Sequence, residues 1–130
     1  SKAKGMCVGP QNAEETEQTY DTLDKQMEDP YSIYNFVKQT ISIRNAFPEI
    51  ARGTNTFEKD LSNDNVCIFT REYNGEKAVL IFNPSKDEAS VDVSSLGVND
   101  AVAMLQTTKK APSYKDGTAK LPAYSVLVLK

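Results

Sequence analysis

The chain has 130 residues, enough for one domain with a substantial buried core, and 39% of them are hydrophobic, as is usual in globular proteins. Its net charge of −3 comes from interspersed acidic and basic residues, so the Lys and Arg clusters of nucleic-acid-binding surfaces are missing. Histidine is absent and no apolar run approaches the ~20 residues of a membrane span, so we expect no cofactor or metal and no nucleic-acid or membrane partner.

Residues 1–28 are acidic and polar, and they predict a long loop. Gly5, Gly9 and Pro10 interrupt any early helix. A catalytic carboxyl pair is not expected here, because a general acid needs a buried setting that raises its pKa. We interpret the acidic residues as a solvated surface: Glu14, Glu15, Glu17, Asp21, Asp24 and Glu28.

One helix is predicted over about residues 30–46. Asp29 suits the N-cap, and Pro30 suits the first helical position, where a missing N–H costs nothing. Pro48 ends the helix, because the residue before a proline avoids the α conformation. An apolar face that another element must cover is formed by Ile33, Phe36, Val37 and Ile41.

From residue 49 onward the pattern changes to short strands. Residues 66–73 and 77–83 flank Asn74-Gly75, the strongest short hairpin signal, and Asp116-Gly117 marks a second tight turn. Further strands are predicted at 89–93, 101–106 and 123–129. We therefore predict a mainly β fold, an antiparallel Greek-key-like β-sandwich preceded by a long loop and one α-helix. Its expected core residues, with Tyr124 covering them, are Val66, Ile68, Phe69, Val79, Ile81, Val126 and Val128.

The two cysteines, Cys7 and Cys67, admit two interpretations. They could form one disulfide that closes a long loop, or remain a pair of thiols. Cys67 lies in an apolar strand pattern, which favours burial as a thiol. The sequence leaves the pairing open.

Three segments together resemble the α-amylase family of glycoside hydrolases, family thirteen. Residues 26–36, continuing through 41–53, resemble the last barrel helix of that family, in which a Gln, an Asp and a Ser precede a helix that ends in Ile-Arg, Pro and Gly. Residues 66–71 are similar to its first long strand after the barrel, and residues 121–129 to its final strand. Within the family, the likeness is to bacterial α-amylases acting on starch-like glucans.

The resemblance implies a division of the chain into two parts. Residues 1–48 would be the tail of a (β/α)₈ catalytic barrel, as a loop plus the last helix, and residues 49–130 would be the C-terminal β-sandwich domain. A whole barrel needs about 250 residues, more than this chain holds. The family's catalytic carboxylates lie on earlier barrel strands, so the resemblance implies a non-catalytic chain that supports the barrel of an extracellular or cell-surface parent enzyme. Without that barrel, the apolar helix face should dock on the sandwich, self-associate or aggregate.

Four residues are candidates for substrate contact. Many relatives have an Arg and a Met followed by a Trp in the loop before the helix, and the resemblance extends this role to Lys4 and Met6, although the Trp is missing here. Tyr73 and Tyr114 lie beside the predicted turns and could stack on sugars, which would make the chain an independent α-glucan-binding module. The other interpretation is that both tyrosines cover the edges of the sandwich.

Overall fold

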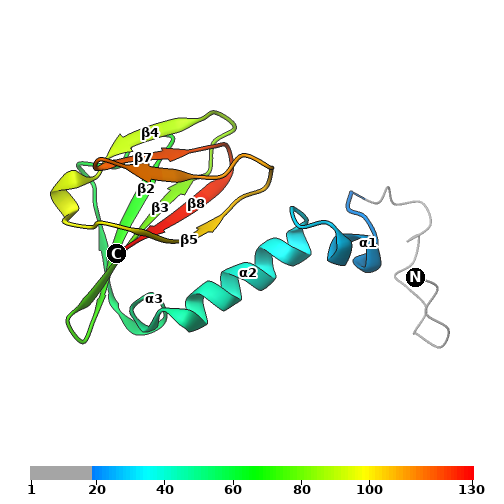
Figure 1. The fold of residues 1–130 in the computed structure, drawn as a ribbon, viewed down its shortest axis with the longest axis horizontal. Helices are drawn as coiled ribbons and strands as arrows, with labels where there is room; N and C mark the ends of the chain where they lie inside the picture. The colour runs from blue at the N-terminus through cyan, green and yellow to red at the C-terminus, as the bar shows by residue number, and fades with distance from the viewer. Residues whose placement is uncertain (1–18) are drawn as a thin grey trace.

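The computed structural model describes residues 19–130, in which a helical segment is followed by two antiparallel sheets (Figure 1). The helices are α1 (Leu23–Glu28), α2 (Ile33–Ala46) and α3 (Pro48–Arg52), with a 3₁₀ turn η1 (Ser94–Leu96) between strands. The strands are β1 (Thr54–Phe57), β2 (Cys67–Tyr73), β3 (Glu76–Asn83), β4 (Ala89–Asp92), β5 (Ala101–Leu105), β6 (Ser113–Lys115), β7 (Thr118–Leu121) and β8 (Ser125–Leu129).

The strands form a β-sandwich, as predicted. One sheet has the order β1-β2-β3-β8-β5 and the other has the order β4-β7-β6. The chain crosses between the sheets after β3, β4, β5 and β7, and the last strand returns to lie between β3 and β5. In Figure 1, α2 and α3 run along the side of the larger sheet that faces away from the smaller sheet. We call that side the outer face.

Both predicted hairpin turns are confirmed. Asn74 and Gly75 have φ values of 51° and 82°, and Asp116 and Gly117 have values of 50° and 79°. Two consecutive left-handed residues match the right-handed twist of the flanking strands. The pairs that close the turns are Tyr73 with Glu76, and Lys115 with Thr118.

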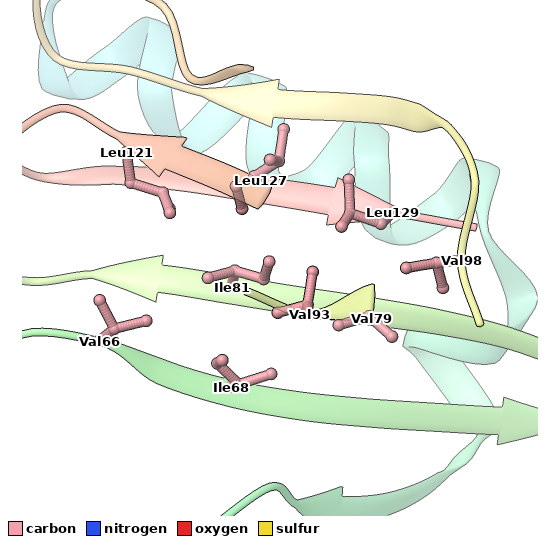
Figure 2. Close-up of a cluster of buried hydrophobic side chains, with 10 residues drawn as sticks. Val66, Ile68, Val79, Ile81, Val93, Val98, Leu121, Leu127 and Leu129 are labelled. Atoms are coloured by element: carbon pink, nitrogen blue, oxygen red, sulfur yellow. The ribbon is translucent and has the colours of Figure 1, made fainter. Parts of the chain in front are cut away.

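The buried core lies between the two sheets, where Figure 2 shows aliphatic side chains converging. The predicted residues Val66, Ile68, Val79 and Ile81 belong to it. In the last strand, Leu127 and Leu129 point into this core, so the prediction was wrong for Val126, which faces outward and is only half-buried. Val128 is buried, as predicted, but on the outer face and outside this cluster. Phe69 is also on the outer face, one residue from Ile68. The remaining core residues are Val93, Val98, Ala119 and Leu121.

The helical segment differs from the prediction in two ways. First, α1 occupies residues that were predicted to be loop. Second, Asp29 is not the cap of the main helix: α2 begins after Ser32, whose Oγ accepts a hydrogen bond from the Asn35 N–H at 3.3 Å. Asp29 instead accepts from the Tyr31 N–H at 2.9 Å. Pro30 therefore precedes the helix. As predicted, α2 ends before Pro48, which is the first residue of α3.

Candidate functional site

Helix α2 has two apolar faces. Phe36 is half-buried on the side near the larger sheet, and Phe47, the residue after the helix, is half-buried as well. On the exposed side, Ile33, Val37 and Ile41 are 50–54% exposed, and Leu23 of α1 is 55% exposed. We call these last four residues the helix stripe. They line a groove of about 480 Å³ together with Gln26, Tyr34 and Lys38.

A polar network joins α1 to α2 and so completes the stripe. The Gln26 carbonyl accepts hydrogen bonds from Ser32 Oγ at 2.5 Å and Asn35 Nδ2 at 2.9 Å. The Gln26 side-chain Oε1 accepts from the Tyr34 N–H at 3.2 Å. These contacts fix Leu23 beside the first turns of α2, so the stripe continues across both helices.

The outer face of the larger sheet carries a second apolar surface, a row of three phenylalanines. The ring centroids of Phe57 and Phe69 are 5.3 Å apart, and those of Phe69 and Phe82 are 5.9 Å apart. Phe57 is 49% exposed. Beside this row lies a groove of about 320 Å³, lined by Ile50, Asn55, Phe69, Arg71, Leu80 and Phe82.

Charged side chains hold α3 against this sheet. Arg71 donates from Nε to the Glu49 carbonyl at 3.3 Å and from an Nη to the Ile50 carbonyl at 3.0 Å. Both acceptors are backbone carbonyls of the five-residue helix α3. Lys130 Nζ pairs with the buried Glu49 carboxylate at 2.8 Å and with Glu76 at 3.1 Å. Burial on its own raises the pKa of Glu49, but the hydrogen bond and charge of Lys130, together with a hydrogen bond from the Glu49 backbone, hold that pKa below its ordinary value. The end of β8 is thereby tied to the helical segment.

The structure places the four sequence-predicted contact residues apart. Tyr73 is half-buried at the end of β2, and Tyr114 lies in β6 of the other sheet. Tyr114 packs on the core, and its hydroxyl donates to the Val98 carbonyl at 2.8 Å. Both positions fit the interpretation in which these tyrosines cover the sandwich. Sugar contact by either one stays a prediction, and Lys4 and Met6 lie outside the described residues.

Sequence reasoning missed an exposed aromatic residue, Tyr124. It was expected to cover the core, yet it precedes β8 and is 52% exposed, with a φ of 51°. It borders a notch of about 260 Å³ between the first half of α2 and the sheet, lined by Phe36, Phe82, Asn83, Pro84, Thr107, Tyr124, Ser125 and Val126. The signal was Pro122, which in the run 121–129 keeps the next residues out of the ladder.

Other expected chemistry has the following outcome. Asp21 pairs with Lys25 at 3.1 Å on an exposed surface, while Glu14, Glu15 and Glu17 lie outside the described part of the chain. Within residues 19–130, no three His, Cys, Asp or Glu side chains gather as metal ligands. Over the same span, no helix has the length and apolarity to cross a bilayer. Cys67 is a half-buried free thiol, and its candidate partner Cys7 is not described.

Comparison with known proteins gives one sequence-family match and several similar structures. The pattern of the maltogenic amylase C-terminal domain family matches residues 60–128. The chain is similar to Amy13B of Eubacterium rectale, with 98% sequence identity and a TM-score of 0.93. The match covers 100% of this chain but only 26% of Amy13B. Trehalulose synthase MutB of Pseudomonas mesoacidophila MX-45 has 23% identity and a TM-score of 0.68 over 82% of this chain and 19% of its own, a likeness of fold alone. No curated protein gives a significant match.

Proposed function

Because the chain belongs to the family of maltogenic amylase C-terminal domains, we propose that it serves as the non-catalytic terminal domain of an α-amylase-type glycoside hydrolase acting on starch-like α-1,4-glucans. In this proposal residues 1–48 are the tail of the catalytic barrel and residues 49–130 are the domain that supports it. The matched segment, 60–128, falls inside the second part. Starch is a polymer too large to cross a membrane intact, which supports an extracellular or cell-surface parent.

The two-faced helix α2 is the observation that carries this proposal. One face is fixed on the sandwich, while the helix stripe is left half-exposed as a continuous apolar surface. Apolar patches of this kind usually mark an interface. The partner we propose is the preceding part of the same polypeptide, since this chain covers 26% of the nearly identical Amy13B. The remainder is long enough for a barrel of about 250 residues.

The catalytic groups belong to the parent in this proposal. A retaining glycosidase needs two carboxyl groups about 5 Å apart, one as nucleophile and one as acid and base. We assign those groups to the barrel and none to this chain. The contribution of the chain is then mechanical: Arg71 and Lys130 hold α3 on the sheet, and α3 in turn contacts α2, the proposed last barrel helix.

The proposal is tested by placing a charge in the helix stripe in two settings. In a longer protein that carries this segment, Val37→Asp buries a carboxylate and should lower stability by about 3 kcal/mol, with loss of starch hydrolysis at elevated temperature. In the isolated chain, at a concentration low enough for it to be monomeric, Val37 is 50% exposed, so the same change should leave the melting temperature within a few degrees. Ser42→Asp, at an exposed polar position of the same helix, is the control and should be neutral in both. Equal effects of Val37→Asp in both settings would contradict the proposal.

For the isolated chain, we propose self-association through the same stripe. Without a barrel, two stripes can cover each other. Light scattering should then show a concentration-dependent dimer that Val37→Asp returns to a monomer. A wild-type chain that stays monomeric at high concentration would rule out this partner.

An independent α-glucan-binding module is the second candidate function. The exposed Tyr124 beside its notch is the observation that favours it. This candidate and the first are compatible, because one chain can both support a barrel and bind a glucan.

A further inference from the structure

Tyr124 has an unusual backbone for a bulky residue. Its φ of 51° lies in the left-handed region, which large L-residues rarely adopt. Such a conformation persists only where the surroundings enforce it, and it often marks a functional position. The Tyr124 N–H donates to the Ser85 carbonyl at 3.1 Å, which ties this residue to the turn after β3.

Asn83 is the centre of the frame that holds Tyr124. It is 1% exposed, and its Nδ2 donates to the carbonyls of Leu121 at 3.1 Å and Pro122 at 2.9 Å. Its Oδ1 accepts from the Ser85 N–H at 3.0 Å and from the Ser85 hydroxyl at 2.8 Å. A fully satisfied buried network of this kind is rigid. The ring of Tyr124 is therefore presented outward by a fixed support.

The notch beside Tyr124 has the chemistry of a neutral sugar site. Phe36, Phe82 and Tyr124 supply aromatic surface, and Thr107 adds a hydroxyl. No residue of 19–130 that lines it is charged, so it does not suit phosphates or acidic sugars. Tyr124 is 52% exposed, so its hydroxyl can donate to a ligand. A volume of about 260 Å³ is below the usual range for larger ligands, roughly 300–1,000 Å³, and suits one pyranose ring.

We propose that this notch binds a glucose unit of an α-glucan, with the sugar stacked on Tyr124. A pyranose has an apolar C–H face for the ring and hydroxyls for the polar rim. The identity of the sugar rests on the proposed function. Phe36 lies on the second turn of α2, and the N-terminal ends of barrel helices lie at the face that carries the active site. The notch would thus hold a glucan chain on the catalytic side of the parent.

The test is a titration of the 130-residue chain with maltoheptaose, followed by NMR or calorimetry, with three variants. Tyr124→Gly removes the ring and suits the left-handed backbone, so it should fold normally and bind at least about tenfold more weakly. Tyr124→Phe keeps the stacking surface and should retain most of the binding. Tyr20→Ala removes a tyrosine that is 62% exposed elsewhere and should leave the affinity unchanged.

Two results would overturn the notch as a glucan site: no saturable binding by the wild-type chain up to about 10 mM maltoheptaose, or equal binding by wild type and a folded Tyr124→Gly. The proposed function is judged separately, by starch hydrolysis in the longer protein. If that protein hydrolyses starch while the chain binds no maltoheptaose, the notch proposal alone fails. If the chain binds maltoheptaose through Tyr124 and the longer protein has no activity on α-glucans, the notch stands and the proposed function fails.

Discussion

At the scale of single residues, Asn83 connects three segments of the chain. Its side-chain amide donates hydrogen bonds to the Leu121 and Pro122 carbonyls before β8. It also donates to the Asp87 carbonyl after β3, at 2.8 Å. Asn83→Ala would remove the side-chain donor to the buried Leu121 carbonyl, while the Pro122 carbonyl would keep only the Ser125 hydroxyl. We therefore expect a loss of about 2–4 kcal/mol in the free energy of unfolding, measured by urea denaturation. Asn99→Ala, at an exposed asparagine, should be neutral. A loss below about 1 kcal/mol at position 83 would show that water replaces the lost bonds.

Glu49 makes stability depend on pH. Burial opposes its charge, but Lys130 lowers its pKa in the folded chain below that in the unfolded chain. The unfolded chain therefore binds a proton first as pH falls, so this contribution is present above the ordinary glutamate pKa of about 4.3 and is lost below it. Glu49→Gln should lower the melting temperature at pH 7 and flatten its fall between neutral and acidic pH. An unchanged pH profile would assign the acid sensitivity to other carboxylates.

The β8 error shows what residue patterns leave undecided. Residues 126–129 are all apolar, so the sequence does not show which alternate side chains face the core. A shift of one residue would exchange the two faces of the strand. Here both faces are covered, the inner one by the smaller sheet and the outer one by helices. Val128 is accordingly buried at 2% although it is outside the core cluster. Only the pairing of Leu127 with Ile81 settles which side faces the core.

At the scale of elements, the junction between α3 and β1 depends on Gly53. A Cβ there would meet the Glu49 carbonyl and stand 2.8 Å from the Glu72 carbonyl, both of them backbone atoms. Gly53→Ala should therefore cost more than about 2 kcal/mol, because the backbone must shift. Gly75 has open space but a φ of 82°, so Gly75→Ala should cost only about 1 kcal/mol. Thermal unfolding of both variants checks the order, and the reverse order would place the strain at the turn.

Elements with local signals could be predicted, and those that depend on distant contacts could not. The two hairpins are encoded by Asn74-Gly75 and Asp116-Gly117, whose turn type needs only those residues. Helix α1 has six residues, too few to be stable by propensity, and is held by the bonds of Gln26 with α2. Strand β1 is exposed throughout and exists through its pairing with β2. The choice of Ser32 over Asp29 as cap likewise follows from the Gln26 contacts.

At the scale of the whole molecule, the candidate surfaces also divide into one that local sequence patterns predict and one that depends on distant contacts. The helix stripe was predictable, because Ile33, Val37 and Ile41 recur at helical spacing and stay half-exposed among residues 19–130. For Tyr124 the sequence offered only Pro122, which indicates a break before the strand, because the frame that presents the ring depends on Asn83, which is distant in sequence. The stripe belongs to the helical part and the core belongs to the sandwich, so the two parts of the molecule have separable roles.

That separation predicts the behaviour of a shortened chain beginning at Phe47. The core cluster within residues 19–130 draws no side chain from the helices, and α3 would keep its contacts with Arg71 and Lys130. We expect residues 47–130 to fold cooperatively into the sandwich, as a domain with its own core should. Loss of α2 uncovers the outer face around Phe82, so the melting temperature should fall and binding of a hydrophobic dye should rise. Circular dichroism of an unfolded chain would instead mean that α2 is part of the folding unit and that the proposed boundary at residues 48 and 49 divides one domain.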